Sequence, residues 1–136
     1  MTSTRDSNET HKSTRGLRGL SNALRFSWAG FRHAMAHEAA IRQEIIMLVI
    51  LVPFSAWLPV TDVEHLILVL SMMLVILVEF INSAIEATVD RISAERHPLA
   101  GQAKDKASTA VAIAVLMFGL SWTVIVTPVL VRWVRG

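Results

Sequence analysis

The segment LILVLSMMLVILV, Leu66–Val78, contains a single polar residue, Ser71, and no charge. A helix on the surface of a soluble protein would show polar residues at every turn, and this segment does not. Two further blocks share this character, Ile45–Leu58 and Ala107–Val131. A helix needs roughly 20 residues to cross the hydrocarbon core of a bilayer. We therefore expect an all-α membrane protein with three transmembrane helices, at about 39–60, 63–90 and 105–134.

The composition of the whole chain agrees with this class. Of its 136 residues 53% are hydrophobic, and no cysteine is present, which excludes disulfides, thiolate metal sites and cysteine nucleophiles. The length allows one unit, expected at 16–136. Residues 1–15 are rich in Ser, Thr and charge and predict a disordered tail. A cleavable signal peptide is not expected, because no short apolar core with a cleavage site precedes the first block.

The positions of basic residues predict how the spans are oriented. Seven precede the first apolar block: Arg5, Lys12, Arg15, Arg18, Arg25, Arg32 and Arg42. Four lie between the second and third apolar blocks: Arg91, Arg96, Lys104 and Lys106. The connection PVTD between the first two spans has none. The positive-inside rule then predicts a cytoplasmic N-terminus and second loop, with Trp57 and Trp133 near the outer interface.

An amphipathic helix is expected ahead of the first span, at about 16–38. Its apolar residues recur at steps of three and four: Leu17, Leu20, Leu24, Trp28, Phe31 and Met35. Arginines recur every seventh residue on another face, at Arg18, Arg25 and Arg32. This pattern is typical of a helix lying at the membrane surface. A helix that packs its apolar stripe on the protein's own spans would show the same pattern.

The end of the second span, VEFINSAIEATVD (Val78–Asp90), carries polar residues where lipid-facing ones would be expected. Spacings of three, four and four place Glu79, Asn82, Glu86 and Asp90 on one helical face. A carboxylate in the membrane costs a few kcal/mol on insertion scales, so this stripe indicates a functional site. By helical rise, Glu79 lies just inside the cytoplasmic leaflet and Glu86 at its surface. Alternatively, Asn82 and one acid could merely pair with Arg42 or Lys104 across helices and so hold the spans together.

Other segments bring charge to the same layer. Glu38 and Glu44 stand at the entrance of the first span, and GQAKDKAS brings Lys104 and Asp105 to the entrance of the third. Carboxylates with a lysine can hold a hard divalent cation and steady a polyphosphate. The sequence has no GxxxxGK[ST] phosphate loop, so a nucleotide site must be built from helix side chains. Three spans enclose little alone, which favours a homo-oligomer with sites at subunit boundaries.

The sequence resembles the prokaryotic integral-membrane diacylglycerol kinases from about Arg25 to the third span. EAAIRQE (Glu38–Glu44), VEFINSAIEATVDRI (Val78–Ile92) and AKDKAS (Ala103–Ser108) occur in that family's order and spacing. The resemblance implies a homotrimer in the bacterial inner membrane. Each subunit would have three spans and an amphipathic surface helix, and would transfer the γ-phosphoryl of ATP to a diacylglycerol hydroxyl with Mg²⁺. The partners implied are ATP, the lipid and the membrane, with no nucleic acid.

The resemblance also implies residue roles. Glu79 resembles the general base that takes the proton of the lipid hydroxyl, and Glu38 and Glu86 resemble the carboxylates that hold magnesium. The nucleotide positions are Phe26, Asn82, Asp90, Glu95, Arg96, His97, Lys104 and Asp105. The lipid positions are Arg32, Ala40, Ile41, Arg42, Gln43, Glu44 and Ser108. The chain departs from the family at Gly19, where an arginine is common and Arg18 is the neighbour, and at Phe26, where a tyrosine is common.

Two rival functions are compatible with parts of this pattern. An undecaprenol kinase would use the same scaffold, although VDRI and AERHPLAG look closer to the diacylglycerol branch. A small ion-coupled transporter could also use buried acids. The acids here gather at one interface and no inverted repeat is visible, which counts against a transporter. A lone loop histidine such as His97 is more often simply solvated.

Overall fold

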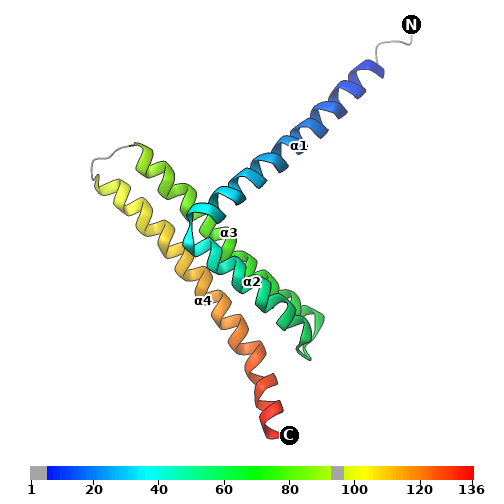
Figure 1. Cartoon of the computed structure of the whole chain (residues 1–136), viewed down its shortest axis with the longest axis vertical. Helices are drawn as coiled ribbons and strands as arrows, with labels where there is room; N and C mark the ends of the chain where they lie inside the picture. The colour runs from blue at the N-terminus through cyan, green and yellow to red at the C-terminus, as the bar shows by residue number, and fades with distance from the viewer. Residues whose placement is uncertain (1–5, 93–96) are drawn as a thin grey trace. The chain divides into compact units, whose positions relative to one another are not determined.

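The computed structural model describes residues 6–92 and 97–136, with side chains from Gly19 onward. Four helices make up this part of the chain: α1 (Asp6–His37), α2 (Ala39–Trp57), α3 (Asp62–Ile92) and α4 (Pro98–Arg135) (Figure 1). No strand occurs among the described residues. The prediction of an all-α protein is confirmed.

The chain divides into two units, residues 1–38 and 39–136. The single unit expected at 16–136 stays a prediction. The first unit holds α1, which begins at Asp6 rather than near residue 16. Residues 6–15 are thus helical where a disordered tail was expected. They contain neither proline nor glycine, so nothing in them breaks a helix that continues from the amphipathic segment. Residues 1–5 lie outside the described part.

The second unit contains three helices that are long and apolar enough to cross a membrane, as expected. Their bounds differ from the expected ones at several ends, most at α4, which begins at Pro98 rather than 105. His97 caps this helix: its Nδ1 accepts a hydrogen bond of 3.2 Å from the N–H of Leu99. Proline suits the first helical position because its missing N–H would have no partner there. The cap and proline together start α4 ahead of its apolar part.

The start of α3 is fixed by a reciprocal pair of hydrogen bonds. The N–H and the hydroxyl of Thr61 each donate to Glu64 Oε2 at 2.8 Å, and the N–H of Glu64 donates back to Thr61 Oγ1 at 3.3 Å. This capping box satisfies backbone donors that a helix start leaves open. It defines where the connection from α2 ends and the second span begins.

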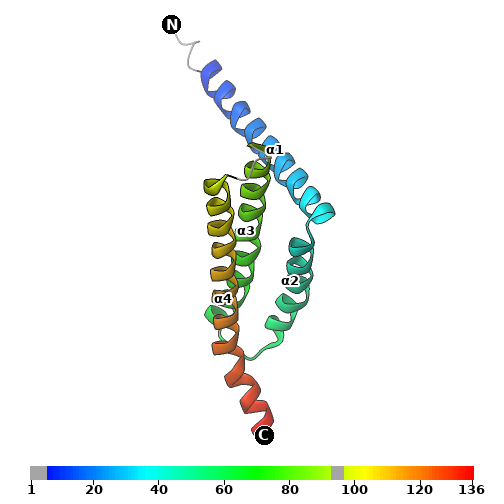
Figure 2. The same ribbon diagram turned by 90° about the vertical axis from the view of Figure 1, so that its left-hand side faces the viewer.

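Within the second unit, α3 packs against both α2 and α4. Figures 1 and 2 show α3 and α4 side by side and antiparallel. A small core near one end is formed by Leu58, Leu68 and Val129. The indole N–H of Trp122 donates to the carbonyl of Leu68 at 3.3 Å, and the hydroxyl of Ser71 donates to the same carbonyl at 2.9 Å. Only the Trp122 bond links α4 to α3, because Ser71 and Leu68 both belong to α3.

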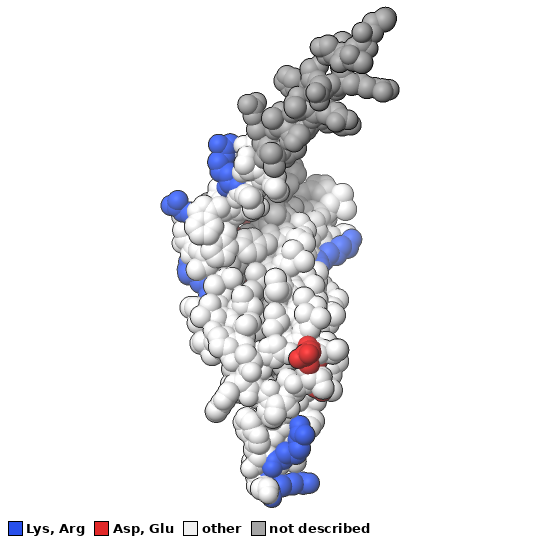
Figure 3. All heavy atoms as spheres, turned by 90° about the vertical axis from the view of Figure 1, so that its right-hand side faces the viewer, with Lys and Arg blue, Asp and Glu red and all other residues white. Residues whose placement is uncertain are grey.

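Most of the apolar surface of the spans lies outside this core. Only 11%, 22% and 6% of the most apolar windows of α2, α3 and α4 is buried, so the remainder requires lipid or neighbouring chains. One face of the molecule shows a broad band without charged atoms between charges at its two ends (Figure 3). The ring centres of Trp57 and Trp133 are 6.3 Å apart, so both rings lie at the same end of the spans. Their position at the outer interface stays a prediction. The protein is therefore a membrane protein.

Candidate functional site

The polar stripe of α3 runs from a partly buried region to an exposed one. Glu79 and Asn82 are half-buried, whereas Glu86 and Asp90 are exposed. The sequence placed the four residues on one face, and the structure adds that they have different surroundings. Each of the four therefore has its own set of neighbours.

Glu79 lies near a second carboxylate on the neighbouring helix. Glu44 of α2 interacts electrostatically with Glu79. Glu44 is half-buried, and its Oε2 is buried without a hydrogen-bond partner among the described residues. Two neighbouring carboxylates repel when both are charged, and a buried acceptor without a donor is costly. This corner between α2 and α3 would be stabilised by a ligand that brings a hydrogen-bond donor or positive charge.

Asn82 connects the buried and exposed parts of the stripe. Its Nδ2 donates a hydrogen bond of 3.3 Å to Glu86 Oε1, one helical turn further along. Its Oδ1 is buried and has no hydrogen-bond partner within the described part of the chain. The amide therefore orients the Glu86 carboxylate and leaves an acceptor for a further group.

A cross-helix ion pair stands at the exposed end. Lys104 Nζ lies 2.6 Å from Asp90 Oδ1, and the two side chains are 38% and 65% exposed. Lys104 also lies within electrostatic reach of Glu86. A pairing of Lys104 with an acid of α3 is the contact expected if polar residues of the stripe serve to hold the helices together. Because the pair is well exposed, solvent and salt weaken it, and the lysine can exchange partners.

The loop and the N-terminal part of α4 carry the remaining nucleotide positions. His97 is exposed, and its Nδ1 is used by the cap, so the neutral ring carries its proton on Nε2. Asp105 is exposed, as is the lipid position Ser108. Glu95 and Arg96 lie outside the described residues. The cap gives His97 a structural role whatever else it does.

Three expected site residues belong to the N-terminal unit. Phe26 and Arg32 are exposed and Glu38 is half-buried. The guanidinium of Arg25 lies 5.4 Å from the centre of the Phe26 ring, within the range of a cation–π contact. The side chain of Arg18 is outside the described ones, so its substitution for the missing arginine at Gly19 stays a prediction.

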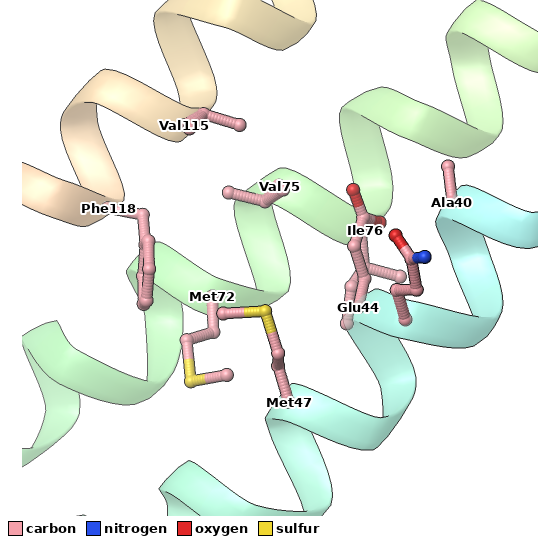
Figure 4. A pocket seen from close by; sticks show the side chains of 9 residues that line it. Ala40, Glu44, Met47, Met72, Val75, Ile76, Val115 and Phe118 are labelled. Atoms are coloured by element: carbon pink, nitrogen blue, oxygen red, sulfur yellow. The ribbon is translucent and has the colours of Figure 1, made fainter.

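A pocket of about 230 Å³ opens between α2, α3 and α4. It is lined by Ala40, Gln43, Glu44, Met47, Met72, Val75, Ile76, Val115 and Phe118. Figure 4 shows the Glu44 carboxylate on the α2 side and Val115 and Phe118 on α4. Glu79 follows Ile76 by one helical turn. The pocket is therefore apolar, with its polar groups gathered near the Glu44–Glu79 corner.

The pocket includes three of the lipid positions expected from the sequence, Ala40, Gln43 and Glu44. Ile41 is completely buried, so it supports the site by packing rather than by contact with lipid. Arg42 is half-buried and has interactions of its own. The sequence did not single out Met47, Met72 or Phe118, because one apolar residue inside an apolar block carries no distinguishing signal.

The donors on this face suit magnesium as part of a site. Among the described residues no group of three His, Cys, Asp or Glu gathers closely enough to hold an ion. Mg²⁺ is usually held by one or two carboxylates together with water and substrate phosphates, rather than by a complete protein cage. An exposed Glu86 oriented by Asn82 fits that pattern.

The chain is an integral membrane protein with three membrane-spanning helices. Acids and a lysine lie together at one end of these spans, and they form a polar site beside an apolar pocket. The family model described as prokaryotic diacylglycerol kinase matches residues 25–126. The chain belongs to this family, and the expected class of lipid kinase enzyme is confirmed.

Several relatives share most of their length with this chain. The diacylglycerol kinase of Escherichia coli K12 is 43% identical over 112 residues, covering 82% of this chain and 92% of the relative. The diacylglycerol kinase of Pseudomonas aeruginosa PAO1 is 42% identical, covering 84% and 93%. The diacylglycerol kinase of Helicobacter pylori J99 is 36% identical, covering 79% and 84%. The likeness therefore extends across the spans and the polar stripe.

Proposed function

We propose that the chain is an ATP-dependent diacylglycerol kinase, which produces phosphatidic acid and ADP. The observation that carries the proposal is the neighbouring Glu44 and Glu79 beside an apolar pocket. Exposed Glu86 follows along α3, and Lys104 of α4 lies within electrostatic reach of it. A lipid hydroxyl cannot leave the membrane interface, and ATP cannot enter the hydrocarbon. A site that is apolar on one side and charged on the other allows the two substrates to meet.

On the lipid side, the pocket takes the part of the acyl chains nearest the glycerol. Gln43 and Glu44 at its polar end are placed to hold the glycerol and ester groups. The hydroxyl is a hydrogen-bond donor, which is what the buried acceptors of Glu44 and Asn82 lack. Arg32 and Ser108 are the further positions that we assign to the lipid.

In the reaction, Glu79 accepts the proton as the lipid oxygen attacks the γ-phosphorus of ATP. A bond forms between that oxygen and the γ-phosphorus. The bond from the γ-phosphorus to the β–γ bridging oxygen breaks, and its electron pair leaves with ADP. The base role needs Glu79 to be shielded from bulk water, and its half-buried position supports this.

On the nucleotide side, Lys104 contacts the phosphates by exchanging Asp90 for them. Glu86 and Glu38 are the residues that would hold Mg²⁺, which neutralises charge on the phosphates when bound. Asn82 keeps Glu86 oriented for that task. The other nucleotide positions in this proposal are Phe26, Asp90, Glu95, Arg96, His97 and Asp105.

We infer that the working form is a homotrimer in the bacterial inner membrane. The large unburied apolar surface of the spans and the small number of donors gathered within one chain support an assembly with shared sites. The basic residues ahead of α2 and between α3 and α4 support a cytoplasmic N-terminus and a cytoplasmic site.

The test is lipid phosphorylation by the purified chain in mixed micelles. Labelled ATP and Mg²⁺ are supplied with either diacylglycerol or undecaprenol, and the products are separated by chromatography. We expect labelled phosphatidic acid, with none from the Glu79→Gln chain. Label in undecaprenyl phosphate alone would contradict the proposed substrate.

A further inference from the structure

Two histidines on α1 lie next to each other on the outside of the N-terminal unit. His33 and His37 are four residues apart, which places them on one helical face. Their ring centres are 4.6 Å apart, and both side chains are exposed. None of the roles in the proposed reaction uses either ring.

This arrangement suits a metal of a different kind from magnesium. Imidazole nitrogens are preferred ligands for Zn²⁺, Cu²⁺ and Ni²⁺, whereas Mg²⁺ prefers oxygen. A histidine pair at positions i and i+4 of a helix is the spacing by which helical zinc sites hold their ion. We propose that His33 and His37 bind one divalent transition-metal cation between them.

The surroundings of the pair indicate an open site. No third His, Cys, Asp or Glu joins the two rings among the described residues, so water would fill the remaining coordination positions. Arg32 precedes His33 and opposes a cation, whereas Glu38 follows His37 and favours one. With two protein ligands, the affinity would be moderate and the metal exchangeable.

One consequence for catalysis rests on the proposed function. Glu38, assigned there to magnesium, is the residue directly after His37. A second dication held one residue away repels Mg²⁺ at Glu38 and so raises the Mg²⁺ concentration needed for turnover. The chain would then sense transition metals through its surface helix.

Binding is tested with Cu²⁺ on the full chain, untagged and in detergent, by electron paramagnetic resonance. We expect one Cu²⁺ per chain with hyperfine coupling to two imidazole nitrogens, undisturbed by excess Mg²⁺. His33→Ala and His37→Ala should each leave one nitrogen and weaken binding by about tenfold or more. The matched control is His65→Ala, in the first turns of α3, which should bind as the wild type does.

Two results would overturn the site: a wild-type Cu²⁺ affinity in both histidine variants, or displacement of Cu²⁺ by Mg²⁺. The consequence is tested separately with Zn²⁺, which should raise the Mg²⁺ midpoint of lipid phosphorylation in the wild type but not in His33→Ala. An unchanged midpoint in the wild type would overturn the consequence. If no lipid were phosphorylated at all, the proposed function would fail, while the Cu²⁺ titration would still decide the site.

Discussion

Lys104 Nζ lies 2.6 Å from Asp90 Oδ1, which joins the N-terminal part of α4 to the last turn of α3. Both side chains are well exposed, so the pair is not a strong tether. Its effect is to hold a cation over the exposed end of the polar stripe, within reach of Glu86. A lysine held in this way can be passed from an aspartate to an incoming phosphate.

Replacing Lys104 should weaken ATP binding more than replacing its partner Asp90. We expect Lys104→Gln to raise the KM for ATP by about tenfold, since a charged hydrogen bond to phosphate is lost. Asp90→Asn removes the ion pair but leaves the cation, so its KM should change less. Initial rates at varied ATP measure both. Lys106→Gln, on the same helix, is the matched control. Equal effects of the two variants would indicate that Lys104 serves only the pair.

Glu79→Gln should abolish phosphoryl transfer while ATP still binds. The variant keeps the size of the side chain but cannot accept the lipid proton, and a general base contributes about 10²- to 10⁴-fold to a rate. Turnover is followed with labelled ATP, and nucleotide binding with a fluorescent ATP analogue. Asp62→Asn, an exposed acid in the first turn of the same helix, is the control and should keep full turnover. Substantial turnover in Glu79→Gln would remove it from the base role.

Glu86→Gln should shift the dependence on magnesium. The loss of one carboxylate oxygen ligand raises the free Mg²⁺ needed for half-maximal rate, and a chelator should stop turnover in every variant. Asn82→Ala removes the hydrogen bond that orients Glu86, so the same midpoint should move in the same direction by a smaller amount. The measurement is the initial rate against free Mg²⁺ at saturating ATP. A midpoint identical to that of the wild type would contradict the ligand assignment.

The spans and the charged face of α3 could be predicted from the sequence, because both follow from periodicity and from the cost of placing charge in lipid. It could not choose the partner of Lys104, since several acids lie at similar depth and only packing selects Asp90. The early start of α4 depends on one cap at His97, a local hydrogen bond that hydropathy does not report. The pocket depends on which apolar side chains of three helices face one another.

Filling the pocket should weaken the lipid substrate selectively. Met72 lines the pocket and is 4% exposed, whereas its neighbour Met73 is 53% exposed and faces away. We expect Met72→Trp to raise the KM for diacylglycerol by roughly tenfold with little change in the KM for ATP, because the indole occupies space meant for an acyl chain. Met73→Trp is the matched control.

A second variant tests the same pocket in case Met72→Trp does not fold. Val115→Phe enters the same pocket from α4, at a position that is itself partly exposed and so more tolerant. Size-exclusion chromatography and circular dichroism check that each variant is folded. If folded Met72→Trp and Val115→Phe both kept the wild-type KM for diacylglycerol, the pocket would not hold the lipid.

Sites shared between subunits should reveal themselves when two inactive chains are mixed. Glu38→Gln lacks a magnesium ligand and Glu79→Gln lacks the base, so each alone should be inactive when free Mg²⁺ is limiting. In a cyclic trimer whose sites take Glu38 from one subunit and Glu79 from the next, every mixed trimer contains one intact site. Random mixing at equal amounts makes three quarters of the trimers mixed, so about a quarter of the wild-type activity should return.

The mixture is prepared by co-expression or by unfolding and refolding the two chains together, and its activity is compared with that of each chain alone. A mixture of Glu79→Gln with Glu79→Ala is the control and should stay inactive, because no subunit supplies the base. Crosslinking followed by electrophoresis reports the number of chains. The mixture of Glu38→Gln and Glu79→Gln could also stay inactive although trimers form. Both carboxylates of a site would then belong to one chain, and the prediction of a site shared between subunits would be wrong.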